Sequence, residues 1–212
     1  MNLNQQYKNI IFDWSGVIND NQLTTYQVIL KVFEHFGIAE ISYDEFRKEW
    51  EQPFMLFYNK YLPDLSLEVE NKVYRNIYQK VIKDYPPKPY PGIVEVVNKC
   101  NENKELFIVS SDHREYLLGE IKDFGFENVF NEVVGSVHDK EDGLRGIAVN
   151  NNLELDKTIF IGDTAHEVDV GQKVGIKTGA VTWGIHSEER LKQAKPDYII
   201  HNLKELESII LD

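Results

Sequence analysis

Short apolar runs recur along the chain, and between them apolar residues return every three or four positions, as they do on one face of a helix. The runs that predict strands are residues 9–14, 105–110, 158–163, 178–183 and 197–200, with another near 132–137. Several of these runs show little alternation, which is typical of parallel strands covered on both faces. Strand–helix–strand repetition of this kind predicts an α/β fold with a doubly wound parallel sheet.

Residues 20–85 interrupt this pattern, because they show helical periodicity without intervening strands. Ser42 and Glu45 have the spacing of a capping box, and the helix that they open is expected to end at Pro53. Ser66 can cap a further helix. The expected apolar face of that helix consists of Val69, Val73, Ile77 and Val81.

The proline-rich segment 85–92 cannot be helical and is expected to form a stiff return linker. We therefore predict two domains: a core made of residues 1–18 and 86–212, and a small helical domain made of residues 19–85. The aromatic residues of the inserted domain are expected to form its core rather than a substrate pocket. They are Trp50, Phe54, Phe57, Tyr58 and Tyr61.

The composition argues against two classes of binding partner. The net charge of −12 argues against nucleic acid and against an anionic membrane surface, both of which call for clustered lysine and arginine. No stretch approaches the length of a membrane span, and the N-terminus lacks the pattern of a signal peptide. A single cysteine, Cys100, excludes an intrachain disulfide and is expected to be packed in a helix. We expect a cytoplasmic protein, whose oligomeric state the sequence does not indicate.

Polar residues close three of the predicted strands. Asp13 ends the first strand, Ser110 and Ser111 end the second, and Asp163 ends the fourth along the chain, while Lys140 precedes a predicted helix. Ligands of doubly wound sheets bind beyond these strand ends. Two facing carboxylates call for a hard divalent cation such as Mg²⁺, and a hydroxyl with a lysine can hold phosphate oxygens. The constellation predicts phosphoryl chemistry.

These residues, in this order, resemble the haloacid dehalogenase superfamily. Its four motifs correspond to "IIFDWSGV", "LFIVSS", Lys140 and "FIGDTAHEVD". The stretches "PYPGIVEVV", "GIKTGAVTWG" and "KPDYIIHNLKEL" look like phosphoglycolate-phosphatase-type members that carry a helical cap after the first motif. The resemblance implies a Rossmann-like core with a helical cap of the C1 type. It also implies a Mg²⁺-dependent phosphatase that acts on a small phosphorylated metabolite.

The resemblance further implies roles for individual residues. Asp13 would be the nucleophile that forms an aspartyl-phosphate, which divides hydrolysis into two displacements. Ser110 and Ser111 would bind the phosphoryl group, and Lys140 would offset the charge that develops in the transition state.

The same resemblance implies a metal site. Asp13, Asp163 and the backbone carbonyl of Ser15 would hold Mg²⁺. Glu167 matches the second acid of the fourth motif, where aspartate is usual, so its contact with the metal could be direct or through water.

Ser15 departs from the family pattern. Phosphatases of this superfamily normally carry a second aspartate two residues after the nucleophile, and general acid–base catalysis of that kind contributes about 10²–10⁴-fold. Three interpretations stay open: a slow phosphatase, an efficient enzyme whose acid or base is Asp112, His113 or a residue of the cap, and a phospho-ligand-binding protein with little turnover. We favour a phosphatase, and a slow one.

Relatives with other residues at the position of Ser15 keep two further reactions open. Dehalogenases use tyrosine there, and phosphonoacetaldehyde hydrolases use alanine and share the tryptophan of "DWSG". The latter need a lysine in the cap, and Lys31, Lys48 and Lys60 do not lie in a similar context. A phospho-receiver domain is disfavoured, because the order of Asp, Ser, Lys and acid does not fit it. Residues 18–20 and 85–91 are expected to act as hinges of the cap.

Overall fold

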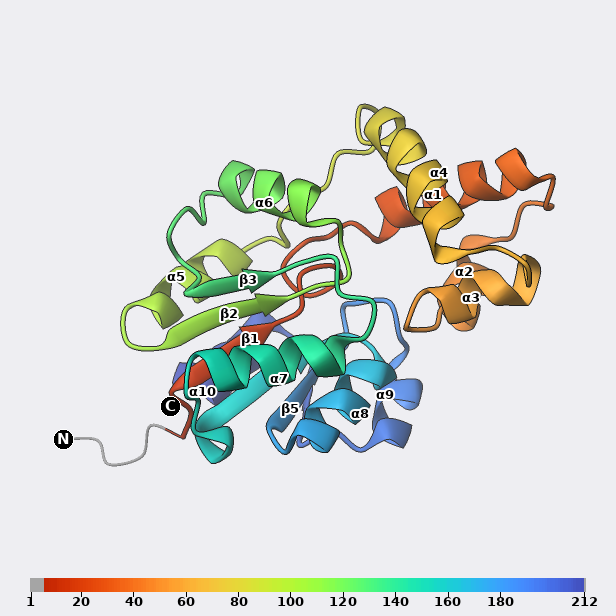
Figure 1. Cartoon of the computed structure of the whole chain (residues 1–212). Helices are drawn as coiled ribbons and strands as arrows, with labels where there is room; N and C mark the ends of the chain where they lie inside the picture. Colours follow the sequence, from red (N-terminus) through yellow and green to blue (C-terminus); the bar gives the residue numbers. More distant parts are fainter. Residues whose placement is uncertain (1–5, 212) are drawn as a thin grey trace.

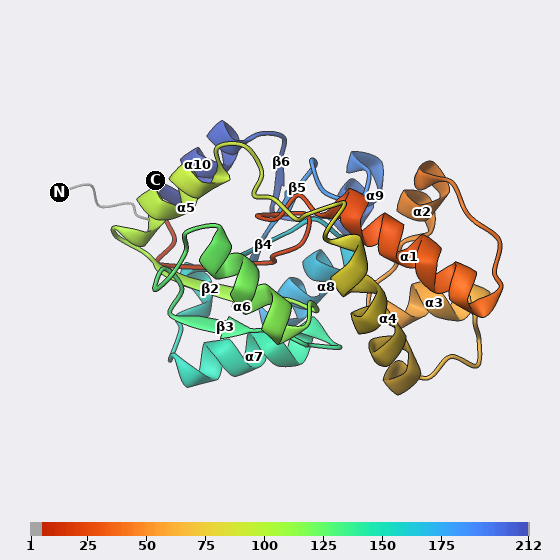
Figure 2. The same cartoon turned by 90° about the horizontal axis from the view of Figure 1, so that it is seen from above.

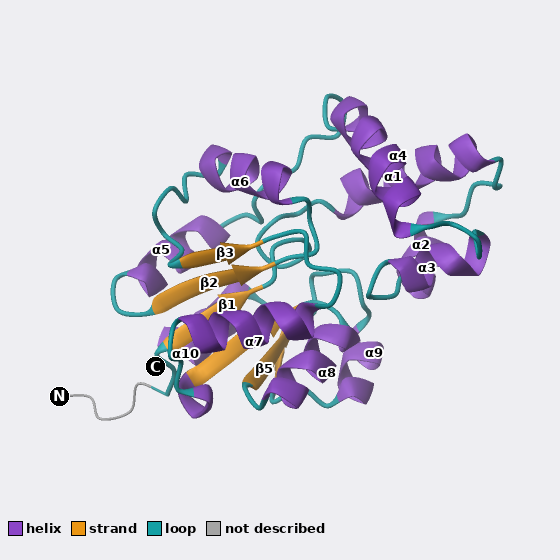
Figure 3. Ribbon diagram, viewed as in Figure 1, coloured by secondary structure: helices purple, strands orange, loops and turns teal. Residues whose placement is uncertain are grey.

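The computed structural model describes residues 6–211 of the chain (Figure 1). It contains a six-stranded sheet of order β3-β2-β1-β4-β5-β6, in which every neighbouring pair is parallel. The strands are β1 (Asn9–Phe12), β2 (Glu105–Val109), β3 (Glu132–Val134), β4 (Thr158–Gly162), β5 (Lys177–Val181) and β6 (Tyr198–Ile200) (Figure 3). All six predicted strands and the doubly wound α/β class are therefore confirmed.

The strand order places β1 where the chain changes direction across the sheet. Ile10 of β1 lies opposite Leu106 of β2, and Phe12 of β1 lies opposite Ile161 of β4. From β1 the chain builds β2 and β3 on one side and β4, β5 and β6 on the other. Ligands of open α/β sheets bind at such a switch point. The residues that follow β1, β2 and β4 thus meet at one edge.

Helices cover both faces of the sheet (Figures 1 and 2). One face carries α5 (Ile93–Asn101), α6 (Arg114–Asp123) and α10 (Leu203–Leu211). The other face carries α7 (Lys140–Asn150), α8 (Ala165–Val174) and α9 (Glu188–Ala194), and the 3₁₀ helix η1 (Leu155–Lys157) precedes β4. Alternate residues of β1 serve the two faces, since Ile10 packs in the first cluster and Ile11 in the second. Cys100 is buried in the first cluster, as predicted.

Between β1 and α5 the chain forms four helices that pack around a cluster of their own. They are α1 (Gln22–Phe36), α2 (Tyr43–Glu49), α3 (Met55–Tyr61) and α4 (Leu67–Val81). The cluster is rich in aromatic rings, and Phe33 and Phe46 each lie 6.0 Å from Phe57 between ring centroids. We call these four helices the helical insert. Within residues 6–211, no helix has both the length and the apolar character that a bilayer crossing requires.

Of three local predictions for the insert, two need correction and one is confirmed. Ser42 caps α2 by accepting a hydrogen bond from the backbone N–H of Glu45, but α2 ends at Glu49, before Pro53. Ser66 caps α4 as expected. The expected apolar face of α4 is confirmed for Val73, Ile77 and Val81, but not for Val69, which is 45% exposed, whereas its neighbour Glu70 is only 3% exposed. The departure from helical periodicity is therefore confined to the first turn of α4.

The segments that lead into and out of the insert lie side by side. Asn19 forms isolated bridges with both Ser15 and Pro89, and the backbone N–H of Asp20 donates to the carbonyl of Lys88 at 2.7 Å. A second bond joins Tyr90 N–H to the carbonyl of Ile18 at 3.0 Å. The two expected hinge segments are thus held to each other. Residues 1–5 and 212 of the expected core lie outside the described residues.

Candidate active site

Asp13 lies directly after β1 at the carboxyl edge of the sheet. Its backbone N–H still bonds to the carbonyl of Ile161 at 2.9 Å, so its position is fixed by the β1–β4 pairing. The chain then turns at Gly16, where φ is +79° and a Cβ atom would lie 2.1 Å from a carboxylate oxygen of Asp163. Asp13 is only 1% exposed. Burial, and next the charge of Glu167, raise the pKa of Asp13 well above its ordinary value.

Lys140 reaches Asp13 from the first residue of α7. Its side chain is 1% exposed, and its Nζ lies 2.8 Å from Oδ1 of Asp13 and forms a second ion pair with Oε1 of Glu167. Burial alone would lower the pKa of Lys140, but the charges of Asp13 and Glu167 outweigh it and raise the pKa. Sequence reasoning placed Lys140 in this neighbourhood. Its enclosure between two buried carboxylates was not foreseen.

Glu167 is held by the start of α8. Thr164 and Glu167 form a capping box, and Oε2 of Glu167 accepts hydrogen bonds from the backbone N–H groups of Asp163 (2.7 Å) and Thr164 (3.0 Å). Burial would raise the pKa of Glu167, but Lys140 and these bonds lower it to about 2. One carboxylate oxygen therefore serves the helix N-terminus, while the other faces Lys140.

Asp163 follows β4 and lies in a space that only glycines leave open. A Cβ atom on Gly184, like one on Gly16, would lie 2.1 Å from its side chain, and the backbone N–H of Ile185 donates to Oδ2 at 2.7 Å. Burial, together with the charge of Glu167, raises the pKa of Asp163 to about 8. The glycines thus bring the backbone against a carboxylate that has no cation in direct contact among the described residues.

The three buried carboxylates fit a divalent cation. Asp13, Asp163 and Glu167 each offer an oxygen within 4.8 Å of the others, and Lys140 is the one cation that pairs with this group within residues 6–211. When all three acids are ionised, two negative charges are unbalanced in a desolvated site, which is unfavourable without a counter-ion. Mg²⁺ prefers such hard oxygen ligands. The donor set and its charge therefore match the predicted metal site.

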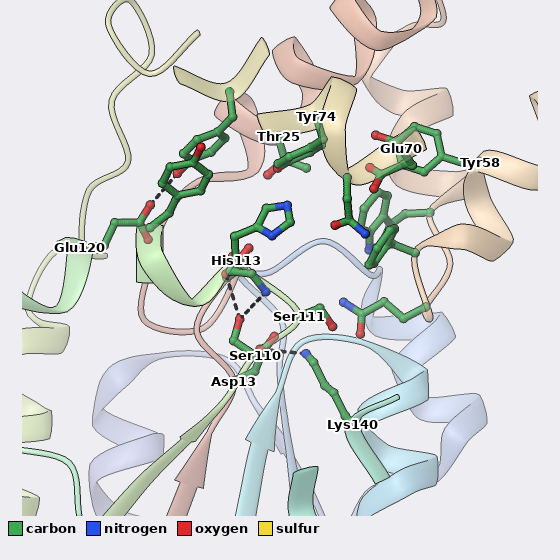
Figure 4. Close-up of a pocket in the computed structure, with 18 residues that line it drawn as sticks. Asp13, Thr25, Tyr58, Glu70, Tyr74, Ser110, Ser111, His113, Glu120 and Lys140 are labelled. Atoms are coloured by element: carbon green, nitrogen blue, oxygen red, sulfur yellow. Dashed lines mark hydrogen bonds and ion pairs between the residues drawn. The ribbon is translucent and has the colours of Figure 1, made fainter. Parts of the chain in front are cut away.

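The serine motif follows β2. Ser110 is 1% exposed; its backbone N–H bonds to the carbonyl of Val134 at 2.9 Å, and its hydroxyl donates to Oδ2 of Asp112 at 2.9 Å. Ser110 and Ser111 line the same pocket as Asp13 and Lys140 (Figure 4). All four predicted groups of the motifs are thus brought together at one sheet edge.

The sequence profile of the haloacid dehalogenase-like hydrolases matches residues 10–181. The chain belongs to this hydrolase family. It is 28% identical over 129 residues to the pyrophosphatase PpaX of Halalkalibacterium halodurans, which covers 58% of this chain and 60% of that protein. It is 25% identical over 219 residues to the pyrophosphatase PpaX of Listeria monocytogenes serotype 4a, which covers 96% of each chain.

Solved structures share the fold of this haloacid dehalogenase-like hydrolase. A haloacid dehalogenase-like protein from Streptococcus pneumoniae superposes with a TM-score of 0.81 at 21% identity, covering 97% of this chain and 99% of that one. A protein from Clostridium acetobutylicum described as a predicted phosphatase gives 0.83 at 23% identity, covering 97% and 98%.

Ser15, which we expect to depart from the family pattern, has well-defined partners. The hydroxyl of Ser15 donates to Oδ2 of Asp112 at 2.5 Å and accepts from the side-chain amide of Asn21 at 2.7 Å. Because Asp112 also accepts from Ser110, one carboxylate links the ends of β1 and β2. Sequence reasoning named Asp112 among several candidates, but nothing in the spacing selected it or revealed Asn21.

A pocket extends from Asp13 toward the helical insert (Figure 4). The expectation that the aromatic residues of the insert serve only its core is wrong for three of them, because Trp50, Phe54 and Tyr58 line this pocket. Phe57 and Tyr61 pack in the cluster of the insert, as expected. The same layer of rings therefore closes the insert and forms one wall of the site.

The core and α4 meet through Glu120, which the sequence did not single out. Its carboxylate accepts hydrogen bonds from Trp14 Nε1 (2.7 Å), Asn19 Nδ2 (2.8 Å) and the hydroxyl of Tyr78 (2.6 Å). Burial, and next the charge of Asp112, raise the pKa of Glu120 to about 7 against the effect of these bonds. A tryptophan directly after the nucleophile was the available signal, since its N–H needs a buried acceptor.

On the side of the insert away from Glu120, two arginines connect the insert to the core. Arg47 of α2 donates to the backbone carbonyls of Gly184 and Ile185 at 3.2 and 3.1 Å. Arg190 of α9 donates to the carbonyl of Trp50 at 2.9 Å and pairs with Glu51 at 2.6 Å. The insert therefore rests on the core at two places, with the pocket between them.

Proposed function

We propose that this hydrolase is a Mg²⁺-dependent phosphatase of small phosphorylated metabolites, with Asp13 as its nucleophile. The observation that carries the proposal is the meeting of Asp13, Ser110, Lys140 and Asp163 at one buried sheet edge that opens into a pocket. The names of relatives, which include pyrophosphatases, agree with phosphoryl chemistry.

The reaction proceeds in two displacements. An oxygen of Asp13 attacks phosphorus, the alcohol oxygen leaves with the bonding pair and takes a proton, and an aspartyl-phosphate results. Water then attacks phosphorus and gives up a proton, the bond between phosphorus and the Asp13 oxygen breaks with its electron pair staying on that oxygen, and phosphate and the free carboxylate of Asp13 result. Ser110 and Ser111 would bind the phosphoryl oxygens, and Lys140 would balance their charge in the transition state.

Asp13, Asp163, the carbonyl of Ser15 and Glu167, directly or through water, are the groups that would hold Mg²⁺, which supplies positive charge beside the phosphoryl group. Lys140 pairs with the same carboxylate that attacks, so it also restrains the orientation of Asp13. Glu167 in turn orients Lys140. The metal and the lysine together would neutralise a site that holds three carboxylates.

We further propose that residues 19–85 form a cap over a core of residues 1–18 and 86–212. The separate aromatic cluster of the insert and its two contact areas with the core support this division. Such a cap excludes water from the site when it closes, which strengthens the electrostatic interactions inside.

The test is Mg²⁺-dependent release of phosphate from 4-nitrophenyl phosphate and from small metabolite phosphates. Release should vanish in Asp13→Asn and in a sample treated with a chelator, whereas Asp20→Asn, an exposed carboxylate nearby, should keep it. A folded protein that binds Mg²⁺ yet releases no phosphate from any ester would contradict the proposal. Assays of phosphonate cleavage, halide release and phospho-ligand binding would then decide among the alternatives that Ser15 leaves open.

A further inference from the structure

For a site that accepts phosphates, the pocket is lined by unusually many acidic side chains and few basic ones. Beyond Asp13 and Lys140, the ionisable lining consists of Glu70, Asp112, His113, Glu120 and tyrosines. Lys140 is already paired with Asp13 and Glu167. A second phosphate or a carboxylate on the substrate would therefore meet carboxylates rather than a free cation.

Two basic side chains of α4 line another hollow. Arg75 lines a separate hollow together with Lys72, and its Nε donates to Nδ1 of His113 at 3.4 Å. His113 lies between that hollow and the pocket, because it lines both. Among residues 6–211, no arginine lines the pocket that contains Asp13.

Glu70 is the acid that needs an explanation. It is 3% exposed on α4, it lines the pocket, and no ion pair reaches it within residues 6–211. Burial raises its pKa to about 7, and Tyr58 is the neighbour that opposes this effect. The helix turns Glu70 inward while Val69 stays 45% exposed, which reverses the ordinary preference of the two residue types. Burial of a carboxylate without a paired cation is energetically unfavourable, and such groups are typical of ligand sites.

The surroundings of Glu70 suit a positively charged group. Figure 4 shows Glu70 beside Tyr58 at the inner wall of the pocket, with Tyr74 above the same space. Tyr74 stacks on Tyr78, whose ring stacks in turn on Tyr116 at 4.7 Å between centroids. Aromatic faces attract ammonium groups, by about 2 kcal/mol when the pair is desolvated.

An unused acceptor completes this wall. The side-chain carbonyl of Gln52 is buried and has no hydrogen-bond partner. It lines the same pocket as Glu70. A ligand that brings N–H donors satisfies both groups, whereas a neutral apolar ligand leaves both desolvated and unpaired.

We propose that the pocket selects phosphate monoesters of amino alcohols, with the ammonium group held by Glu70, Gln52 and the aromatic wall. The inference rests on the proposed phosphatase function and names the substrate class of that site. It separates this chain from relatives named as pyrophosphatases, because pyrophosphate offers a second anion where the pocket offers carboxylates.

The test compares ω-aminoalkyl phosphates, from 2-aminoethyl to 6-aminohexyl phosphate, with alkyl phosphates in which a methyl group replaces the ammonium. The best aminoalkyl ester should exceed its neutral partner in kcat/KM by about tenfold or more, while 2-phosphoglycolate and pyrophosphate should be poorer than both. In Glu70→Gln the ratio should fall close to one. Glu68→Gln, an exposed glutamate of the same helix, should leave the ratio unchanged.

Binding is measured separately from turnover by calorimetry on Asp13→Asn and on Asp13→Asn with Glu70→Gln. The first protein should bind the aminoalkyl ester about tenfold more tightly than the alkyl ester, and the second should not discriminate. Absence of discrimination by Asp13→Asn overturns the inference. Release from neutral esters alone also overturns it and leaves the proposed function intact. Selective binding without any release would instead sustain the inference and contradict the phosphatase function.

Discussion

The hydroxyl of Ser15 lies 2.5 Å from a carboxylate oxygen of Asp112, so the residue at the position where the resemblance implies a second aspartate is in contact with another acid. An aspartate introduced at position 15 would face Asp112 directly, and two carboxylates at this distance repel. We expect Ser15→Asp alone to gain little turnover. The double variant Ser15→Asp with Asp112→Asn should turn over 4-nitrophenyl phosphate about tenfold faster than Ser15→Asp.

Steady-state kinetics of the parent, the two single variants and the double variant give a double-mutant cycle, which measures the interaction between positions 15 and 112. Asp112→Asn alone should lose activity, because Ser110 and Ser15 then lack a charged acceptor. Asp123→Asn, an exposed acid at the end of α6, is the matched control. A Ser15→Asp variant as fast as the double variant would show that the two acids do not compete.

Lys140 should be essential for stability as well as for activity. Its removal in Lys140→Met leaves Asp13, Asp163 and Glu167 buried without a cation, which we expect to lower the free energy of unfolding by about 3–5 kcal/mol. Mg²⁺ should restore part of that loss, since it binds the same group. Urea unfolding with and without Mg²⁺ measures both effects, and Lys157→Met, half-buried but outside the site, should change neither.

Glu120 should make the folded protein less stable as pH rises. Its pKa is raised to about 7 in the folded protein from an ordinary 4.5, so the folded state favours the protonated form. The contribution of Glu120 to the free energy of unfolding is therefore fully present below about pH 4.5 and is lost as pH rises toward 7. Glu120→Gln can keep all three hydrogen-bond partners and removes this dependence. Relative to the parent, the variant should gain on the order of 3 kcal/mol between about pH 4.5 and pH 8.

Urea midpoints at about pH 5 and about pH 8 provide the measurement for Glu120→Gln. Glu127 is an exposed glutamate just after α6, and in Glu127→Gln the urea midpoint should change between the two pH values by the same amount as in the parent. If the urea midpoint of Glu120→Gln also changed with pH as it does in the parent, Glu120 would be charged throughout this range in the folded protein.

The bond from Tyr78 to Glu120 should hold the insert against the core. Tyr78→Phe removes the hydrogen bond to Glu120, which is worth about 1.5–3 kcal/mol when that carboxyl group is ionised, and keeps the ring stacked on Tyr116. We expect faster amide hydrogen exchange in α4 and a KM for metabolite esters raised by about tenfold. Tyr85→Phe, an exposed tyrosine of the return linker, is the control, and equal exchange in both variants would mean that Arg47 and Arg190 suffice to hold the insert.

The strand pattern and the order of the motifs were enough to predict the sheet, the insertion point and the approach of Asp13, Ser110, Lys140 and Asp163. These depend on backbone path, and parallel strands bring their ends to one edge. The burial of Glu70 at the start of α4 could not be predicted in this way, because periodicity favoured Val69 for the buried side of the helix. The contact of Ser15 with Asp112 joins residues far apart in sequence, which no local pattern records.

The central position of β1 has a consequence for how the chain is made. β1 leaves the ribosome first, but its partners β2 and β4 are the segments 105–109 and 158–162. The helical insert is contiguous and carries its own apolar cluster, so it is the first unit that can close during synthesis. Until β2 has been translated, the nascent chain holds a folded helical unit beside an unpaired apolar strand, and that strand is the segment that a chaperone would have to shield.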